Sequence, residues 1–187
     1  NVHLLSDKVA RLFIYLPLVG TEQWGVNFML HAPMFTCSTD DRSSLRLIMD
    51  GQTADDPATN NRQYINEATD MVFEYISLHL AEWQDVHHLA PIHFNVGNAN
   101  MELSDYYKSL KADWVQRMRN LNMVRVNTDE GCKMVQPSSI YVLDAALAKA
   151  AVTNPDLLMP LYRVLSNMYK DSVPAPELLV YWSQVFD

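Results

Sequence analysis

Glycine is scarce in this chain. The 187 residues include five glycines, and no two of them stand within four residues of each other. Loops that cradle phosphates bring glycines close together so that backbone amides can approach the anion. The chain also contains neither a Gly-x-Gly pattern nor a Gly-Lys-Ser/Thr pattern. These absences exclude a recognisable nucleotide-binding loop within the chain, so we predict that it holds no cofactor by itself.

Cysteine is equally scarce, because Cys37 and Cys132 are the only two. Two cysteines are too few for a disulfide framework, and neither belongs to a Cys-x-x-Cys pattern. No apolar run approaches the length of a bilayer span, and no basic-then-apolar leader opens the chain. We therefore predict a cytoplasmic protein with no membrane partner. Because the chain begins with Asn1 rather than Met, we expect it to be a fragment of a longer protein.

Basic residues are outnumbered, with 14 lysines and arginines against 22 aspartates and glutamates, for a net charge of -8. An acidic surface repels phosphate backbones, so we predict no nucleic-acid partner. Apolar residues, in contrast, are plentiful. They make up 49% of the chain, which is enough to build a folded core.

The first half of the chain is typical of two strands and a long helix. Residues 9–16 and 26–32 are rich in β-branched, aromatic and aliphatic types, and each run ends at a proline. They could pair as a hairpin with a long connection. Apolar residues then recur at helical spacing from about residue 61 to about residue 88. We expect the small sheet to pack on this long helix.

The second half is predicted to be mostly helical. Helices are expected over residues 104–120, 144–151, 155–171 and 176–186. A short hairpin is expected from 123–126 and 132–136, with a further strand at 138–144. Strands and helices without regular alternation favour the α+β class. A weak boundary divides the chain into units 1–90 and 91–187, although one continuous domain is the alternative.

Histidines and carboxylates crowd one stretch and are the weak candidates for a metal site. The candidate ligands are His79, Glu82, Asp85, His88 and His93. His79 and Glu82 share a helix face, because residues three apart do so. A zinc site requires three or four such ligands to converge, and His-Glu-x-x-His is absent. Histidines also gather at helix ends for dipole reasons alone, and we favour that interpretation over a metal site.

Four aromatic residues are candidates for contact with another protein. Trp24 lies in a predicted loop, and Tyr181, Trp182 and Phe186 lie close to the C-terminus. Large aromatic side chains outside a helical core stripe are enriched at interfaces. Ordinary packing within the chain is the alternative.

One pattern in the first third resembles a known family. Leu12–Leu18 reads LFIYLPL, Val26–Ala32 reads VNFMLHA, and Asp41–Leu45 reads DRSSL. This order is similar to the segment that follows the ATPase domain in sacsin-like, heat-shock-chaperone-like GHKL ATPases. The resemblance covers about residues 9–48. Ala32 stands where the family usually has glycine, and Ser43 replaces the second arginine of the turn.

The resemblance implies a role beside a nucleotide domain. ATP and Mg²⁺ would be bound by a domain upstream of this chain, and a basic residue from this segment would reach the terminal phosphate. Arg42 is the first candidate and Arg46 the second. The alternative for Arg42 is an ion pair with a neighbouring carboxylate such as Asp40.

Three hypotheses follow. The first is a non-catalytic coupling region of a larger ATPase. It contacts the nucleotide domain, with client proteins as further expected partners, and leaves apolar surface within residues 9–48. The second is a free-standing protein-interaction module built on the C-terminal helices. The third is a metal-dependent enzyme that uses the cluster from His79 to His93.

Overall fold

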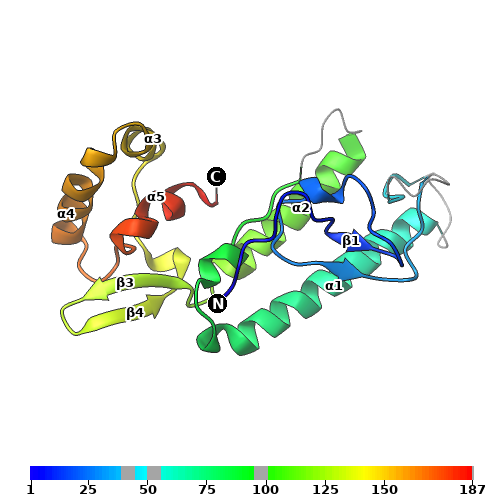
Figure 1. Ribbon diagram of the computed structural model, residues 1–187, viewed down its shortest axis with the longest axis horizontal. Helices are drawn as coiled ribbons and strands as arrows, with labels where there is room; N and C mark the ends of the chain where they lie inside the picture. The colour runs from blue at the N-terminus through cyan, green and yellow to red at the C-terminus, as the bar shows by residue number, and fades with distance from the viewer. Residues whose placement is uncertain (39–44, 50–55, 95–100, 187) are drawn as a thin grey trace. The chain divides into compact units, whose positions relative to one another are not determined.

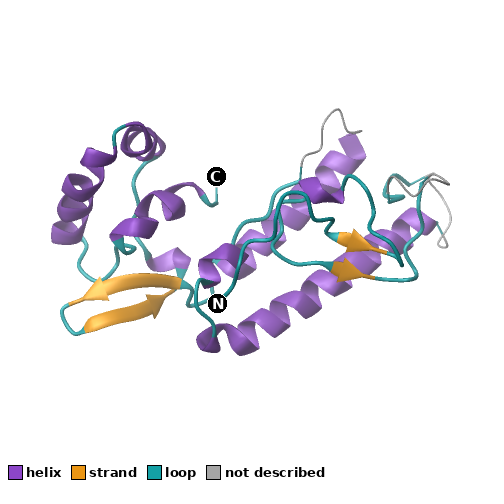
Figure 2. Cartoon of the chain, viewed as in Figure 1, coloured by secondary structure: helices purple, strands orange, loops and turns teal. Residues whose placement is uncertain are grey.

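The computed structural model describes residues 1–38, 45–49, 56–94 and 101–186. Its helices and small strand pairs confirm the predicted α+β class (Figure 1). Among the described residues, strand structure is confined to one parallel pair and one antiparallel pair (Figure 2). The described helices include none that is both long enough and apolar enough to cross a bilayer.

The chain separates into two compact units, Asn1–Trp114 and Val115–Asp187. The division falls inside helix α2 (Met101–Met118), later than the boundary expected at residues 90–91. The reason lies in the packing of α2, because Tyr107 and Leu110 belong to the same buried cluster as Leu12 and Ile65. The first turns of α2 are therefore part of unit 1.

The two N-terminal strands are short and run parallel. Strand β1 (Leu12–Phe13) pairs with β2 (Leu30–His31), so the expected hairpin direction is wrong. A tight turn ends β1 early, since the Ile14 amide donates to Leu16 O at 3.2 Å and the Leu18 amide donates to Leu12 O at 2.9 Å. The chain then crosses over through a short 3₁₀ helix, Thr21–Gln23, before β2 begins.

Helix α1 (Pro57–His79) begins and ends earlier than expected. Asp56 caps it, because its carboxylate accepts a hydrogen bond from the Ala58 amide at 2.9 Å, and Pro57 occupies the first turn, where a missing amide costs little. Beyond His79 the chain tightens into two 3₁₀ helices, Leu80–Glu82 and Val86–Leu89. Between them, Asp85 adopts a left-handed backbone conformation with φ of 59°, which interrupts the helix.

Unit 2 contains the predicted hairpin. Strands β3 (Val124–Thr128) and β4 (Gly131–Val135) pair antiparallel, which confirms that prediction. Gly131 has φ of 131°, a conformation that glycine adopts at little cost, and it starts β4. The strand expected at 138–144 is absent from this described stretch, which holds a 3₁₀ turn, Pro137–Ser139, and extended backbone instead.

Three helices complete unit 2, namely α3 (Ala145–Thr153), α4 (Leu158–Met168) and α5 (Pro176–Gln184). Their contact faces surround a buried cluster that includes Leu143, Ala148 and Leu179. Ser183 links α5 to the chain before α3, because its Oγ accepts from the Leu143 amide at 3.1 Å and donates to Leu179 O at 2.7 Å.

Candidate interaction surface

The segment that carries the family resemblance builds much of the core of unit 1. Its buried side chains pack with Ile65 of α1 and Leu110 of α2. These buried residues are Leu12, Ile14, Leu18, Leu30, Phe35, Leu45 and Leu47. The strands and both helices lie together in Figure 1, as this shared core requires.

The same segment also exposes large apolar side chains. These are Tyr15, Leu16, Val19, Met29, Met34 and Ile48. Tyr15 and Leu16 are 72% and 64% exposed and lie on the turn that ends β1. The centres of the Tyr15 and His31 rings lie 6.4 Å apart in an edge-to-face arrangement, so this turn adjoins β2. Concentrated exposed apolar side chains are typical of protein-contact surfaces.

Strand β2 adds exposed side chains beside this turn, because the burial of its successive residues alternates. Leu30 is buried, whereas its neighbours Met29 and His31 are exposed, because successive side chains of a strand point to opposite faces. We call the exposed side chains of Tyr15, Leu16, Met29 and His31 the N-terminal surface.

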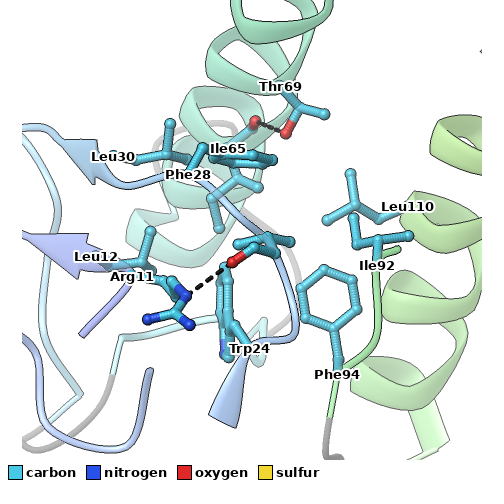
Figure 3. A pocket seen from close by; sticks show the side chains of 11 residues that line it. Arg11, Leu12, Trp24, Phe28, Leu30, Ile65, Thr69, Ile92, Phe94 and Leu110 are labelled. Carbon is cyan, nitrogen blue, oxygen red and sulfur yellow. Dashed lines mark hydrogen bonds between the residues drawn. The ribbon is translucent and has the colours of Figure 1, made fainter. Parts of the chain in front are cut away.

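A small cavity lies beneath the strands of unit 1 (Figure 3). Its volume is about 10 Å³, which accommodates no more than about one water molecule. Trp24, Phe94 and Leu110 form part of its wall, and the polar groups beside them are paired. Thr69 Oγ1, for example, donates to Ile65 O at 2.7 Å. The cavity is a gap in the packing and has no room for a ligand or cofactor.

Arg11 is a buried cation whose structural role the sequence pattern did not predict. Its guanidinium donates to Val26 O at 2.8 Å and Ser6 O at 3.1 Å, and it also bonds Val9 O. These partners are backbone carbonyls, so Arg11 fastens the N-terminal residues to the loop before β2. A lone arginine within an apolar run gives no signal in the sequence, because its partners are set only by the fold.

Arg62 is a second basic residue that sequence reasoning missed. Its Nε donates to Leu47 O at 2.8 Å and its Nη2 pairs with Glu102 Oε1 at 2.7 Å. Its guanidinium also lies 4.8 Å from the centre of the Tyr106 ring. Arg62 therefore joins α1 to the end of the resembling segment and to α2.

Of the two arginines predicted to reach a phosphate, the structure describes Arg46. Arg42 lies outside the described residues. Arg46 is half-buried, and its backbone is fixed by two hydrogen bonds. Its amide donates to Thr36 O at 3.0 Å, and its carbonyl accepts from Asn61 Nδ2 at 2.7 Å.

Trp24 packs inside unit 1. Its half-buried indole meets the rings of Phe94 and Tyr107 edge to face, at 5.1 and 5.8 Å. Burial raises the pKa of Tyr107 to about 12, and the Arg62 charge opposes part of that rise. The indole is therefore part of an aromatic core cluster.

The C-terminal aromatic residues also pack against one another. Trp182 is only 4% exposed, and its ring lies 5.3 Å from Tyr181 and 6.0 Å from Phe186, both half-buried. Burial raises the pKa of Tyr181. Several exposed apolar side chains of unit 2 lie elsewhere, on α3 and α4. They include Val152, Met159, Val164 and Met168.

The five candidate metal ligands, all within the described residues, do not converge on one point. His79 Nδ1 lies 3.4 Å from Glu82 Oε2, and its ring stacks against Trp83 at 6.0 Å. His93 instead lies against Gly25, where an added Cβ would fall 1.8 Å from the imidazole ring. Within the described ranges, no three His, Cys, Asp or Glu side chains are grouped to hold a metal ion.

Unit 2 has a larger, polar depression of about 290 Å³ between the β3–β4 turn and the end of α4. Lys170, Asp129 and Asp171 line it, so its charges are of mixed sign. Ser166 Oγ, also in its wall, is buried without a hydrogen-bond partner. The depression has room for a small polar molecule, but its mixed charges select no single class.

Comparisons with known proteins leave the family open. No known family, no curated protein and no solved structure matches the chain. The relation to sacsin-like ATPases therefore stays a prediction that depends on residues 9–48.

Proposed function

We propose that this chain is a non-catalytic coupling region of a larger sacsin-like GHKL ATPase, and that its N-terminal surface docks onto the neighbouring nucleotide domain. The observation that supports this function is the group of large apolar side chains exposed within residues 9–48. A coupling region needs such a surface, because it must bury apolar area against another domain to transmit a change in it. The resemblance of the same residues to the segment after the ATPase domain agrees with this role.

The proposed mechanism divides the chemistry between domains. The upstream domain binds ATP and Mg²⁺, and docking of residues 9–48 brings a basic side chain toward the terminal phosphate. Arg42 is the first candidate for that side chain and Arg46 the second. A guanidinium suits this role because it keeps its charge and donates in a fixed fork. Client proteins would bind elsewhere on the chain.

The test is a surface variant in the intact protein. Tyr15→Ser combined with Leu16→Ser should lower ATP turnover by about tenfold or more, since each lost apolar contact weakens docking by roughly 1.5–3 kcal/mol. Both side chains are exposed, so the fold should survive. The matched control is Val164→Ser combined with Met168→Ser on α4, where the lost side chains are similarly exposed.

Two results would contradict the coupling role. One is unchanged ATP turnover in the Tyr15/Leu16 variant and in Arg42→Ala. The other is a gene in which no Asn-rich helix and no Asp-x-Gly-x-Gly loop is encoded upstream of Asn1, because the nucleotide domain would then be absent.

A protein-interaction module in unit 2 is the second candidate function. The exposed apolar side chains of α3 and α4 favour it, and they replace Tyr181, Trp182 and Phe186 as its contact residues. If this function is the correct one, the Val164/Met168 variant will lose protein partners in a pull-down, whereas the Tyr15/Leu16 variant will retain them.

A further inference from the structure

Helix α1 has a second apolar face besides the one that it buries. Its buried face carries Ile65, Thr69 and Ile76. Met71, Tyr75 and Leu78, in contrast, are 70%, 58% and 70% exposed. Large apolar side chains usually avoid such exposure in groups, so this face needs an explanation. We call these three side chains the α1 stripe.

The spacing of the α1 stripe matches helix pairing. Residues 71, 75 and 78 follow the i, i+4, i+7 pattern, which places them one above another on a helix surface. This is the pattern by which one helix presents anchors to another helix. The stripe also lies well away from Ile65 and Ile76 around the helix, so a partner can reach it without disturbing the core.

An aromatic group widens the stripe at its C-terminal end. The Tyr75 ring lies 4.5 Å from the His79 ring and 5.7 Å from the Trp83 ring. Tyr75 is exposed, and His79 and Trp83 are half-exposed. Faces of such rings attract lysine and arginine side chains through cation–π contact.

The charged residues that lie beside the α1 stripe on the helix are acidic. Glu67 and Glu74 precede Met71 and Leu78 by four residues each, so each glutamate lies on the same side of the helix as the stripe residue that follows it. The sequence has no lysine or arginine between Arg62 and Lys108. If a second copy of this chain paired antiparallel with this stripe, about a two-fold axis near Tyr75, Glu74 of one copy would lie close to Glu74 of the other. A partner with basic flanks would instead neutralise them.

We propose that the α1 stripe binds an amphipathic helix whose apolar side chains are flanked by lysines or arginines. The partner's apolar residues cover Met71, Tyr75 and Leu78, and its basic residues meet Glu67, Glu74 and the faces of Tyr75 and Trp83. This site is separate from the N-terminal surface, so it does not depend on the proposed coupling role.

The experiment uses two synthetic helical peptides as probes. Both carry leucines at i, i+4 and i+7, with lysines as flanks in one and glutamates in the other. Fluorescence anisotropy should show saturable binding of the lysine peptide alone. Leu78→Ser and Tyr75→Ser should each weaken that binding at least tenfold, whereas the control Val164→Ser on α4 should leave it unchanged. The Glu67→Lys/Glu74→Lys variant should bind the glutamate peptide more tightly than the lysine peptide.

Three outcomes would overturn the proposal. The first is equal binding of a scrambled lysine peptide, which would show attraction by net charge alone. The second is unchanged binding in Leu78→Ser and Tyr75→Ser. The third is self-association of the chain in sedimentation that Leu78→Ser abolishes, which would make a second copy the occupant. Because none of these measurements involves ATP or residues 9–48, their failure is distinguishable from failure of the coupling role.

Discussion

Asn61 shows how much one buried polar side chain contributes to unit 1. It is fully buried on α1, where its Nδ2 donates to Thr36 O and Arg46 O, each at 2.7 Å. Its Oδ1 accepts from the Thr36 amide at 3.0 Å. A single amide thus satisfies three backbone groups from a segment that precedes the helix.

We predict that Asn61→Ala destabilises the protein by roughly 3 kcal/mol, because buried backbone groups lose their partners as well as the hydrogen bonds. Urea unfolding should show a lower midpoint. Gln63→Ala is the matched control, since Gln63 is exposed and its side-chain amide donates to Glu67 of the same helix, at 2.7 Å. Equal midpoints for the two variants would contradict this role of Asn61.

Residue patterns in the sequence allowed part of this core to be predicted. Ile65, Thr69 and Ile76 recur at helical spacing, and all three are buried. Arg11, Asn61 and Arg62 could not be assigned in the same way. Their partners are backbone groups or side chains far along the chain, and no local pattern encodes such contacts.

Among the helices, α3 illustrates a boundary set by local chemistry. Asp144 precedes an alanine-rich run and its carboxylate accepts from the Leu147 amide at 2.8 Å. This bond satisfies one of the amides that the first turn of a helix leaves free.

We predict that Asp144→Ala costs about 1 kcal/mol of stability through loss of this cap, and that Asp144→Asn costs only a few tenths because an amide oxygen also accepts. Thermal unfolding followed by circular dichroism measures both. If Asp144→Asn destabilises as much as Asp144→Ala, the carboxylate acts through its charge rather than through the cap.

The strands contrast with the helices. The β3–β4 hairpin follows from nearby residues, since its turn is short and Gly131 adopts the required conformation. The β1–β2 pair does not, because its parallel direction depends on a crossover of the chain between Phe13 and Leu30. Parallel pairing joins residues that no short turn connects, so the sequence pattern alone led to the wrong direction.

At the scale of the whole molecule, the buried clusters of the two units draw on different residues. The cluster of unit 1 includes Leu12, Ile65 and Leu110, and that of unit 2 includes Leu143 and Leu179. Separate cores allow each unit to lose its structure without the other.

The Leu179 side chain is fully buried. We predict that its truncation in Leu179→Ala destabilises unit 2 by about 2–5 kcal/mol. Hydrogen exchange measured by mass spectrometry should accelerate in peptides from residues 115–187 and stay unchanged in peptides from residues 1–94. Faster exchange of equal size in both sets of peptides would show that the two units unfold as one.

The sequence by itself determined the α+β class, the existence of most helices, the β3–β4 hairpin and the apolar character of residues 9–48. These features depend on periodicity, caps and turn residues, which act over a few positions. Only the tertiary structure decided the parallel pairing of β1 with β2, the inclusion of the start of α2 in unit 1, and the exposure of Tyr15, Leu16 and the α1 stripe. Those outcomes depend on which distant surfaces meet, because an apolar side chain is buried only when another element covers it.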